Sequence, residues 1–247
     1  MELYRHSTQL LCVRQDLTQI TFQQFWQDVA QQCQAIKQMK PKTYALWEQS
    51  SYEFLVLLFA ALQAEKEVLL PPHRIADLEQ ELAEQNIHFL SRQTCIPEIN
   101  QTNELKFDDQ FLNHAQIYFY TSGSTGQPKR IPRTLKQLMS EVAGLDASFH
   151  LPQQAIAIAT VSHQHIYGLL FKVLWPLLTH RSFYDWQVAF PEDVVELQKT
   201  LSSLQIKNYV ISSPALLKRW TSDVVLSNCD ALYSSGGKLD AGILEII

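Results

Sequence analysis

Six consecutive small or hydroxylated residues at positions 121–126 have the chemistry of an anion-binding loop. They are Thr121, Ser122, Gly123, Ser124, Thr125 and Gly126. The two glycines can adopt positive φ angles, so the backbone N–H groups can turn inward around an anion. The four hydroxyls add hydrogen-bond donors, and Lys129, three residues further on, adds a positive charge. Together these residues predict a polyphosphate site.

The residues on either side of this stretch decide between alternative kinds of loop. An apolar, aromatic run at 117–121 predicts a short buried strand before it, and a helix is predicted to follow from about Thr134. An ordinary solvated turn is the simplest alternative, but six such residues after a buried strand favour the phosphate loop. A P-loop needs its lysine directly after the last glycine, whereas Gln127 and Pro128 intervene. Because Pro128 also biases Gln127 away from helical geometry, the P-loop is excluded.

A second group of polar residues follows the apolar run at 155–161 and includes His163, His165 and Gly168. That run predicts a strand buried on both faces, and ligands of parallel sheets bind beyond the carboxyl ends of the strands. Two histidines could ligate a metal, but no cysteine or carboxylate is near them in sequence, so we predict no metal site. A histidine with a purely structural hydrogen bond is the other alternative.

A third group, Ser235, Gly236 and Gly237, follows a predicted strand at 231–234. Alone, such a turn usually indicates only a tight bend. However, five of the seven glycines in the chain fall in the three groups. We therefore expect the three loops to meet at one sheet edge and to form a single site.

The rest of the chain predicts the elements that carry these loops. Apolar periodicity and caps predict helices at 22–39, 52–64, 75–85, 135–149, 168–178, 191–204 and 214–220. Strands are predicted at 44–47, 68–70, 87–90, 117–121, 155–161, 182–186, 209–212 and 231–234. Residues 91–113 indicate an irregular connection. Regular strand–helix alternation predicts an α/β protein with parallel sheets and right-handed crossovers.

Composition excludes several classes of protein. The chain has 247 residues, a net charge of −5 and no basic cluster, which argues against nucleic-acid binding. Its longest apolar run, 54–62, is too short to span a bilayer, and we identify no signal peptide. Four widely scattered cysteines indicate a reduced, cytoplasmic protein.

The stretch from Tyr120 to Lys129 resembles the signature loop of the adenylate-forming superfamily of AMP-dependent synthetases and ligases. That family includes acyl- and aryl-CoA synthetases, adenylation domains and luciferases, and its loop typically reads Tyr-Thr-Ser-Gly-Ser-Thr-Gly-x-Pro-Lys-Gly. This chain departs from the pattern at Arg130. Residues 20–36 and 44–73 are similar in pattern to the family's N-terminal helix and strand–helix–strand segment. The resemblance implies mostly parallel sheets flanked by helices, as in the N-terminal portion of the acyl-CoA synthetase and luciferase large domain.

The resemblance also implies roles for the three loops. Residues 121–126 and Lys129 would bind the phosphates of ATP, and Lys129 would act in catalysis together with His165. The stretch His165 to Gly168 is similar to a His-x-x-Gly motif on the acyl-pocket wall. Ser235, Gly236 and Gly237 are similar to a Ser-Gly-Gly segment beside adenine or AMP and the acyl group, although here the segment is one residue shorter.

The reaction that the resemblance implies is the ATP-dependent activation of a small carboxylic acid. The carboxylate attacks the α-phosphorus, pyrophosphate leaves, and the acyl group passes to CoA or to the phosphopantetheine of an acyl carrier protein. Mg²⁺ would take part in the complete enzyme. Which acid and which thiol are used stays open.

The family's Tyr-Gly-x-Thr-Glu and Thr-Gly-Asp motifs and its C-terminal lid do not occur in this sequence. We therefore expect residues 1–247 to be an N-terminal portion of the AMP-binding domain that does not turn over alone. The apolar stretch 242–247 predicts self-association. Two alternatives are a non-catalytic module that binds nucleotide or acyl group, and an unrelated phosphate-handling enzyme such as a kinase.

Overall fold

The computed structural model describes residues 4–94, 105–121, 129–203, 205–222, 224–239 and 241–244. The chain divides into two compact units. The first unit comprises Met1–Gln9, Thr21–Glu141 and Gln164–Ile166, and the second comprises Leu10–Ile20, Val142–His163 and Tyr167–Ile247.

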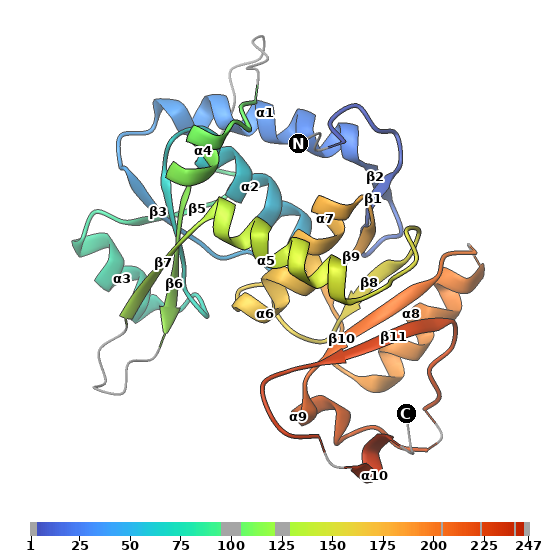
Figure 1. Cartoon of the computed structure of the whole chain (residues 1–247). Coiled ribbons are helices and arrows are strands. Elements are labelled where there is room, and N and C mark those ends of the chain that lie inside the picture. Colours follow the sequence, from blue (N-terminus) through green and yellow to red (C-terminus); the bar gives the residue numbers. More distant parts are fainter. Residues whose placement is uncertain are drawn as a thin grey trace. The chain divides into compact units, whose positions relative to one another are not determined.

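The first unit is built on a five-stranded sheet with the order β5-β3-β4-β6-β7. Figure 1 labels β3, β5, β6 and β7 of this sheet. Its parallel strands are β3 (Thr43–Leu46), β4 (Glu67–Leu70), β5 (His88–Leu90) and β6 (Gln116–Thr121). The last strand, β7 (Lys129–Thr134), runs antiparallel to β6. The carboxyl ends of four parallel strands therefore share one edge of this sheet.

Four helices belong to the first unit: α1 (Phe22–Gln38), α2 (Ser51–Gln63), α3 (Ala76–Glu84) and α4 (Asp109–His114). Nearly every residue of α2 is buried, as its continuous apolar sequence requires. It packs against the apolar stripe of α1, where Trp26 meets Phe59 with ring centroids 5.3 Å apart. Side chains of Thr21 and Ser50 cap α1 and α2.

The six-stranded sheet has the order β11-β10-β8-β9-β1-β2 and is built largely from the second unit. Its strands are β1 (Leu10–Val13), β2 (Gln19–Thr21), β8 (Ile156–Ala159), β9 (Ser182–Gln187), β10 (Asn208–Ser212) and β11 (Cys229–Ser234). The pairs β1–β9, β9–β8, β8–β10 and β10–β11 are all parallel. The carboxyl ends of β8 and β11 therefore also share one edge.

The remaining helices are α5 (Leu135–Ser148), α6 (Ile166–Gly168), the π-helix η1 (Leu169–Leu174), α7 (Trp175–Thr179), α8 (Pro191–Ser203), α9 (Pro214–Leu217) and α10 (Ala241–Leu244). Alternate side chains of the central strands point to opposite faces of the six-stranded sheet. Ile158 joins the cluster that contains Val194 and Leu201 of α8. Tyr209 instead lies against Trp175 of α7, with ring centroids 5.9 Å apart.

These observations confirm the predicted α/β fold of mostly parallel sheets flanked by helices. Several elements differ from the prediction. Strands β1 and β2 and helix α4 were not predicted, and the helix expected at 168–178 is divided into α6, η1 and α7. The helix expected from about Thr134 does follow, as α5, but β7 precedes it. β7 was not predicted because it contains Pro132, and a proline argues against a strand. Proline is tolerated chiefly in edge strands, and β7 is an edge strand of its sheet.

Candidate functional site

The best-defined part of the candidate phosphate site is the end of the β6–β7 hairpin. Thr121, the last residue of β6, pairs with Lys129, the first residue of β7. This pairing fixes where the stretch 122–128 leaves the sheet and where it rejoins it. Five predicted site residues lie outside the described residues, namely Ser122, Gly123, Ser124, Thr125 and Gly126. The pairing lies at the carboxyl edge of the parallel strands, where ligands of such sheets bind.

The two faces of the hairpin have different surroundings. Tyr118 and Tyr120 pack against the apolar cluster that includes Leu78 and Leu82 of α3. Because successive side chains of a strand point to opposite faces, Arg130, which pairs with Tyr120, shares this α3 face. Lys129 therefore leaves the strand on the opposite face, and it is exposed. Sequence reasoning noted Arg130 only as a departure from the family pattern and missed its contacts with α3.

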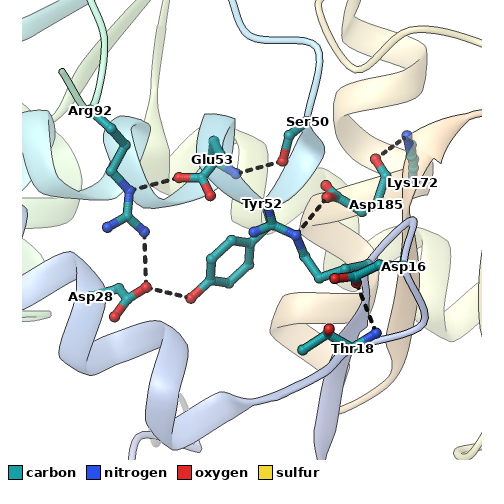
Figure 2. Close-up of polar contacts among 10 residues, drawn as sticks. Asp16, Thr18, Asp28, Ser50, Tyr52, Glu53, Arg92, Lys172 and Asp185 are labelled. Carbon is teal, nitrogen blue, oxygen red and sulfur yellow. Dashed lines mark hydrogen bonds and ion pairs between the residues drawn. The ribbon is translucent and has the colours of Figure 1, made fainter.

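A network of ion pairs ties the exit of β5 to the two long helices of the first unit (Figure 2). Arg92 contacts Glu53 of α2 at 2.6 Å and Asp28 of α1 at 2.9 Å. The hydroxyl of Tyr52 donates to the same Asp28 carboxylate at 2.8 Å. Burial first, and then the Asp28 carboxylate, raise the pKa of Tyr52, so this phenol stays protonated and donates. The network therefore holds the segment that follows the carboxyl end of β5 against α1 and α2.

His165, predicted at the acyl wall, belongs to the first unit and is exposed. Its neighbour Gln164 donates from Nε2 to the backbone carbonyl of Glu48 at 3.3 Å. Glu48 lies just past the carboxyl end of β3, so the structure brings His165 to the same sheet edge as Thr121 and Lys129. His163 is buried, with 3% exposure, and is not presented in the same way.

Gly168 closes the turn that starts at the end of β8. A Cβ atom on this glycine would lie 2.1 Å from the backbone oxygen of Ser162, which is an impossible contact. Its φ of −67° is open to any residue. Close packing therefore explains why this position requires a glycine.

A buried charge cluster follows Gly168 in the second unit (Figure 2). Lys172 of η1 is fully buried and donates from Nζ to the carbonyl of Asp185 at 3.0 Å. The Asp185 carboxylate, also buried, pairs with Arg14 at 3.1 Å. Burial lowers the pKa of Lys172 from 10.5 to about 8, although the Asp185 carboxylate opposes this shift. The cluster joins η1, β9 and the turn after β1.

Ser235, Gly236 and Gly237 follow β11 and are exposed. Gly236 has a φ of +94°, a conformation that favours glycine. The three motifs do not follow strands of a single sheet, so the expectation of one shared sheet edge was wrong: β6 lies in the five-stranded sheet, whereas β8 and β11 lie in the six-stranded one. That the three loops form a single site stays a prediction. Sequence periodicity cannot reveal such a division, because strand pairing is set by contacts distant in the chain.

Neither a metal centre nor a membrane segment emerges from the described residues. They contain no group of three or more His, Cys, Asp or Glu side chains that could hold a metal ion. Nor does any described helix combine the length and apolarity needed to cross a bilayer. A hollow of about 510 Å³ in the first unit lies at the opposite, amino-terminal ends of β3, β4 and β6. Lys42 and Glu67, which line this hollow, form an ion pair with each other at 2.9 Å, and the hollow is not the candidate site.

Comparisons with known proteins place this geometry in context. Residues 73–184, which include the β6–β7 hairpin and His165, match the AMP-binding enzyme family. A 4-coumarate–CoA ligase from Rhodobacter capsulatus is 34% identical over 104 residues, which make up 41% of this chain and 26% of that protein. The aligned region therefore spans about a quarter of that relative's length.

Solved structures share the fold at low sequence identity. An o-succinylbenzoate CoA synthetase from Bacillus subtilis, bound to a product analogue, superimposes with a TM-score of 0.81 at 14% identity, over 100% of this chain and 55% of that one. The same synthetase with its acyl-adenylate intermediate gives a TM-score of 0.78 at 14% identity, over 100% and 70%. The chain thus spans 55% to 70% of the length of these structures. Sequence and fold together confirm the resemblance: this chain carries the N-terminal part of the adenylate-forming, acyl-CoA synthetase-like fold.

Proposed function

We propose that this chain binds the phosphates of ATP and takes part in activating a carboxylic acid as its acyl-adenylate. The observation that carries the proposal is the pairing of Thr121 with Lys129 at the carboxyl edge of the five-stranded sheet. It holds both ends of a stretch rich in glycine and hydroxyl groups next to a lysine. The match to AMP-binding enzymes and the acyl-adenylate complex of the Bacillus subtilis synthetase support the same chemistry.

In this proposal the chain mainly positions reactants and compensates charge. The hydroxyls and N–H groups of 121–126 would bind the β- and γ-phosphates, and Lys129 would stabilise the charge on departing pyrophosphate. His165, at the same sheet edge, would form part of the acyl wall. Ser235, Gly236 and Gly237 would lie against adenine and the acyl group. Because the described residues offer no cluster of metal ligands, we assign no Mg²⁺ ligand.

Residues 1–247 act, in this proposal, as the N-terminal portion of an AMP-binding domain. The acyl group would pass to CoA or to an acyl carrier protein, and the scattered cysteines support a cytoplasmic location. The sequence lacks the family motifs that bind ribose and magnesium. We therefore expect the chain by itself to bind nucleotide with little or no turnover, since losing even one donor that stabilises the developing charge costs about 10²–10³ in rate.

Calorimetric titration with ATP and with AMP tests the phosphate site. Lys129→Ala should weaken ATP binding about tenfold and leave AMP binding nearly unchanged, because AMP lacks the outer phosphates. Lys136→Ala is the matched control, since Lys136 is another exposed lysine of the first unit, paired with Asp109 in α4. An equal loss for both nucleotides would contradict the assignment.

Product analysis of a version of the chain extended through the missing family motifs separates the proposed function from its alternatives. Acid-dependent release of pyrophosphate supports carboxylate activation, and a panel of fatty and aromatic acids would define the substrate class. ATP binding without release in the presence of any acid favours a binding module. Phosphate transferred to an acceptor instead indicates a kinase-like enzyme.

A further inference from the structure

Four side chains join the end of the β6–β7 hairpin to helix α3. Arg130 of β7 donates from Nη2 to the side-chain oxygen of Gln85, the residue that ends α3. Tyr120, directly opposite Arg130 on β6, forms side-chain hydrogen bonds with both Arg130 and Glu81 of α3. Arginine can only donate and a carboxylate can only accept, so the bonds run from Arg130 to the phenol oxygen and from the phenol to Glu81. The result is one connected polar chain across β7, β6 and α3.

The protonation of Tyr120 is consistent with this direction of the bonds. Burial first, and then the Glu81 carboxylate, raise the pKa of Tyr120, while Arg130 acts in the opposite sense. The phenol therefore keeps its proton around neutral pH and can serve as a donor to Glu81.

The two ends of this polar chain differ in how firmly they are held. Helix α3 is anchored by Leu78 and Leu82, which are buried in the cluster with Leu69 of β4. Strand β7 is a sheet edge whose first four residues are exposed. Pro132 supplies no N–H to the ladder with β6. β7 is therefore held chiefly by its ladder with β6, and α3 is the well-packed element to which its first residues are attached.

Lys129 lies one residue before Arg130, on the opposite face of the same strand. A contact that fixes the backbone at Arg130 thus also fixes the origin of the Lys129 side chain. Stabilising charge on a departing group requires that the cation be placed before the reaction, not after it. We propose that Arg130 is a positioning residue, which fastens the β6–β7 hairpin to α3 and so places Lys129 at the phosphate site. The part of this inference that concerns phosphate rests on the proposed function.

Amide hydrogen exchange of the ligand-free chain tests the fastening itself. Arg130→Ala should speed exchange of the backbone amides at 119–121 and 129–131 about fivefold, the value of one ordinary hydrogen bond. Amides of α2 should not change. Arg133→Ala is the matched control on the same strand, because Arg133 donates to the carbonyl of neighbouring Pro132 and not to α3. Equal exchange in the two variants would overturn the proposal.

Side-chain rescue distinguishes a specific contact from a general loss of structure. Gln85→Ala should reproduce part of the effect of Arg130→Ala, and the double variant should add little to the single one. Arg130→Lys keeps the charge and a nitrogen that donates hydrogen bonds, so it should restore much of the protection. If Arg130→Lys behaves like Arg130→Ala, a contact through the cationic end is ruled out.

Nucleotide titrations then test the consequence for Lys129. Arg130→Ala should weaken ATP binding about threefold to fivefold and leave AMP binding unchanged. Faster exchange with unchanged ATP affinity would overturn the positioning role. If Lys129→Ala leaves ATP affinity unchanged, the proposed phosphate site fails, and the exchange experiment alone decides whether Arg130 fastens the hairpin.

Discussion

The two units place their charged side chains in different environments. In the second unit Lys172, Arg181 and Asp185 are at most 7% exposed. Among the described residues of the first unit, the buried polar side chains are serines and glutamines, and Arg92 meets its carboxylates with 30% of its side chain exposed. Buried charges tolerate no loss of a partner, whereas exposed pairs contribute little and are screened by salt. We therefore expect substitution of charged residues to lower the stability of the second unit more than that of the first unit, which carries Lys129.

The largest effect should come from Gly168→Ala in the second unit. The new Cβ would collide with the backbone of Ser162, which cannot move aside as a flexible side chain would. We expect a loss of about 3 kcal/mol in the free energy of unfolding, measured by urea denaturation. Gly144→Ala is the control, because a Cβ at this exposed residue of α5 would meet nothing within 4 Å. That change should stabilise by about 0.5–1 kcal/mol, and similar losses in both variants would refute the packing argument.

The pH dependence of stability sharpens the comparison at Lys172. Burial lowers the pKa of this amine from 10.5 to about 8, so between these pH values the unfolded chain holds a proton that the folded chain has released. The free energy of unfolding should therefore rise with pH across this window, by on the order of 3 kcal/mol relative to Lys172→Met. The neighbouring groups that act on Lys172, Asp185 and Cys12, are present in both proteins, so the difference between the two curves isolates Lys172.

The control for this measurement is Lys199→Met, which replaces a lysine whose side chain is 66% exposed. Its stability curve should run parallel to that of the unsubstituted chain from pH 7 to pH 11. Parallel curves for Lys172→Met as well would show that the buried amine keeps its ordinary affinity for protons.

Sequence reasoning succeeded where the deciding contacts are local. The apolar stripe of α1 and the continuous apolar run of β8 are both visible in the sequence alone. It failed where contacts between distant residues decide: Lys129–Thr134 is polar and contains a proline, and only its pairing with β6 makes it a strand. The burial of Lys172 could not be predicted from the sequence either, because a single lysine in a helix usually reaches solvent. The roles of residues 122–126 stay predictions.

Arg92→Ala tests the partly exposed network of the first unit and should have a smaller effect. Its loss leaves the carboxylates of Asp28 and Glu53 without their shared cation. Because solvent reaches all three side chains, we expect a destabilisation of only about 1 kcal/mol, partly relieved by added salt that screens the two carboxylates. Thermal unfolding at low and high salt measures both. A loss as large as that of Gly168→Ala would show that the first unit also depends on a desolvated charge.

The smallest effects should come from two tyrosines, and they should have opposite signs. In the part of the chain that the structure describes, the buried hydroxyl of Tyr209 has no hydrogen-bond partner, so Tyr209→Phe removes a desolvated polar group while the ring keeps its packing. We expect a gain of about 0.5–1 kcal/mol. Tyr120→Phe instead breaks the bonds to Arg130 and Glu81 and should cost about 0.5 kcal/mol. Chemical denaturation of both variants in the same buffer measures the two changes in the free energy of unfolding. The signs should differ because Tyr209→Phe removes a buried hydroxyl that has no partner among the described residues, whereas Tyr120→Phe removes a hydroxyl that is hydrogen-bonded.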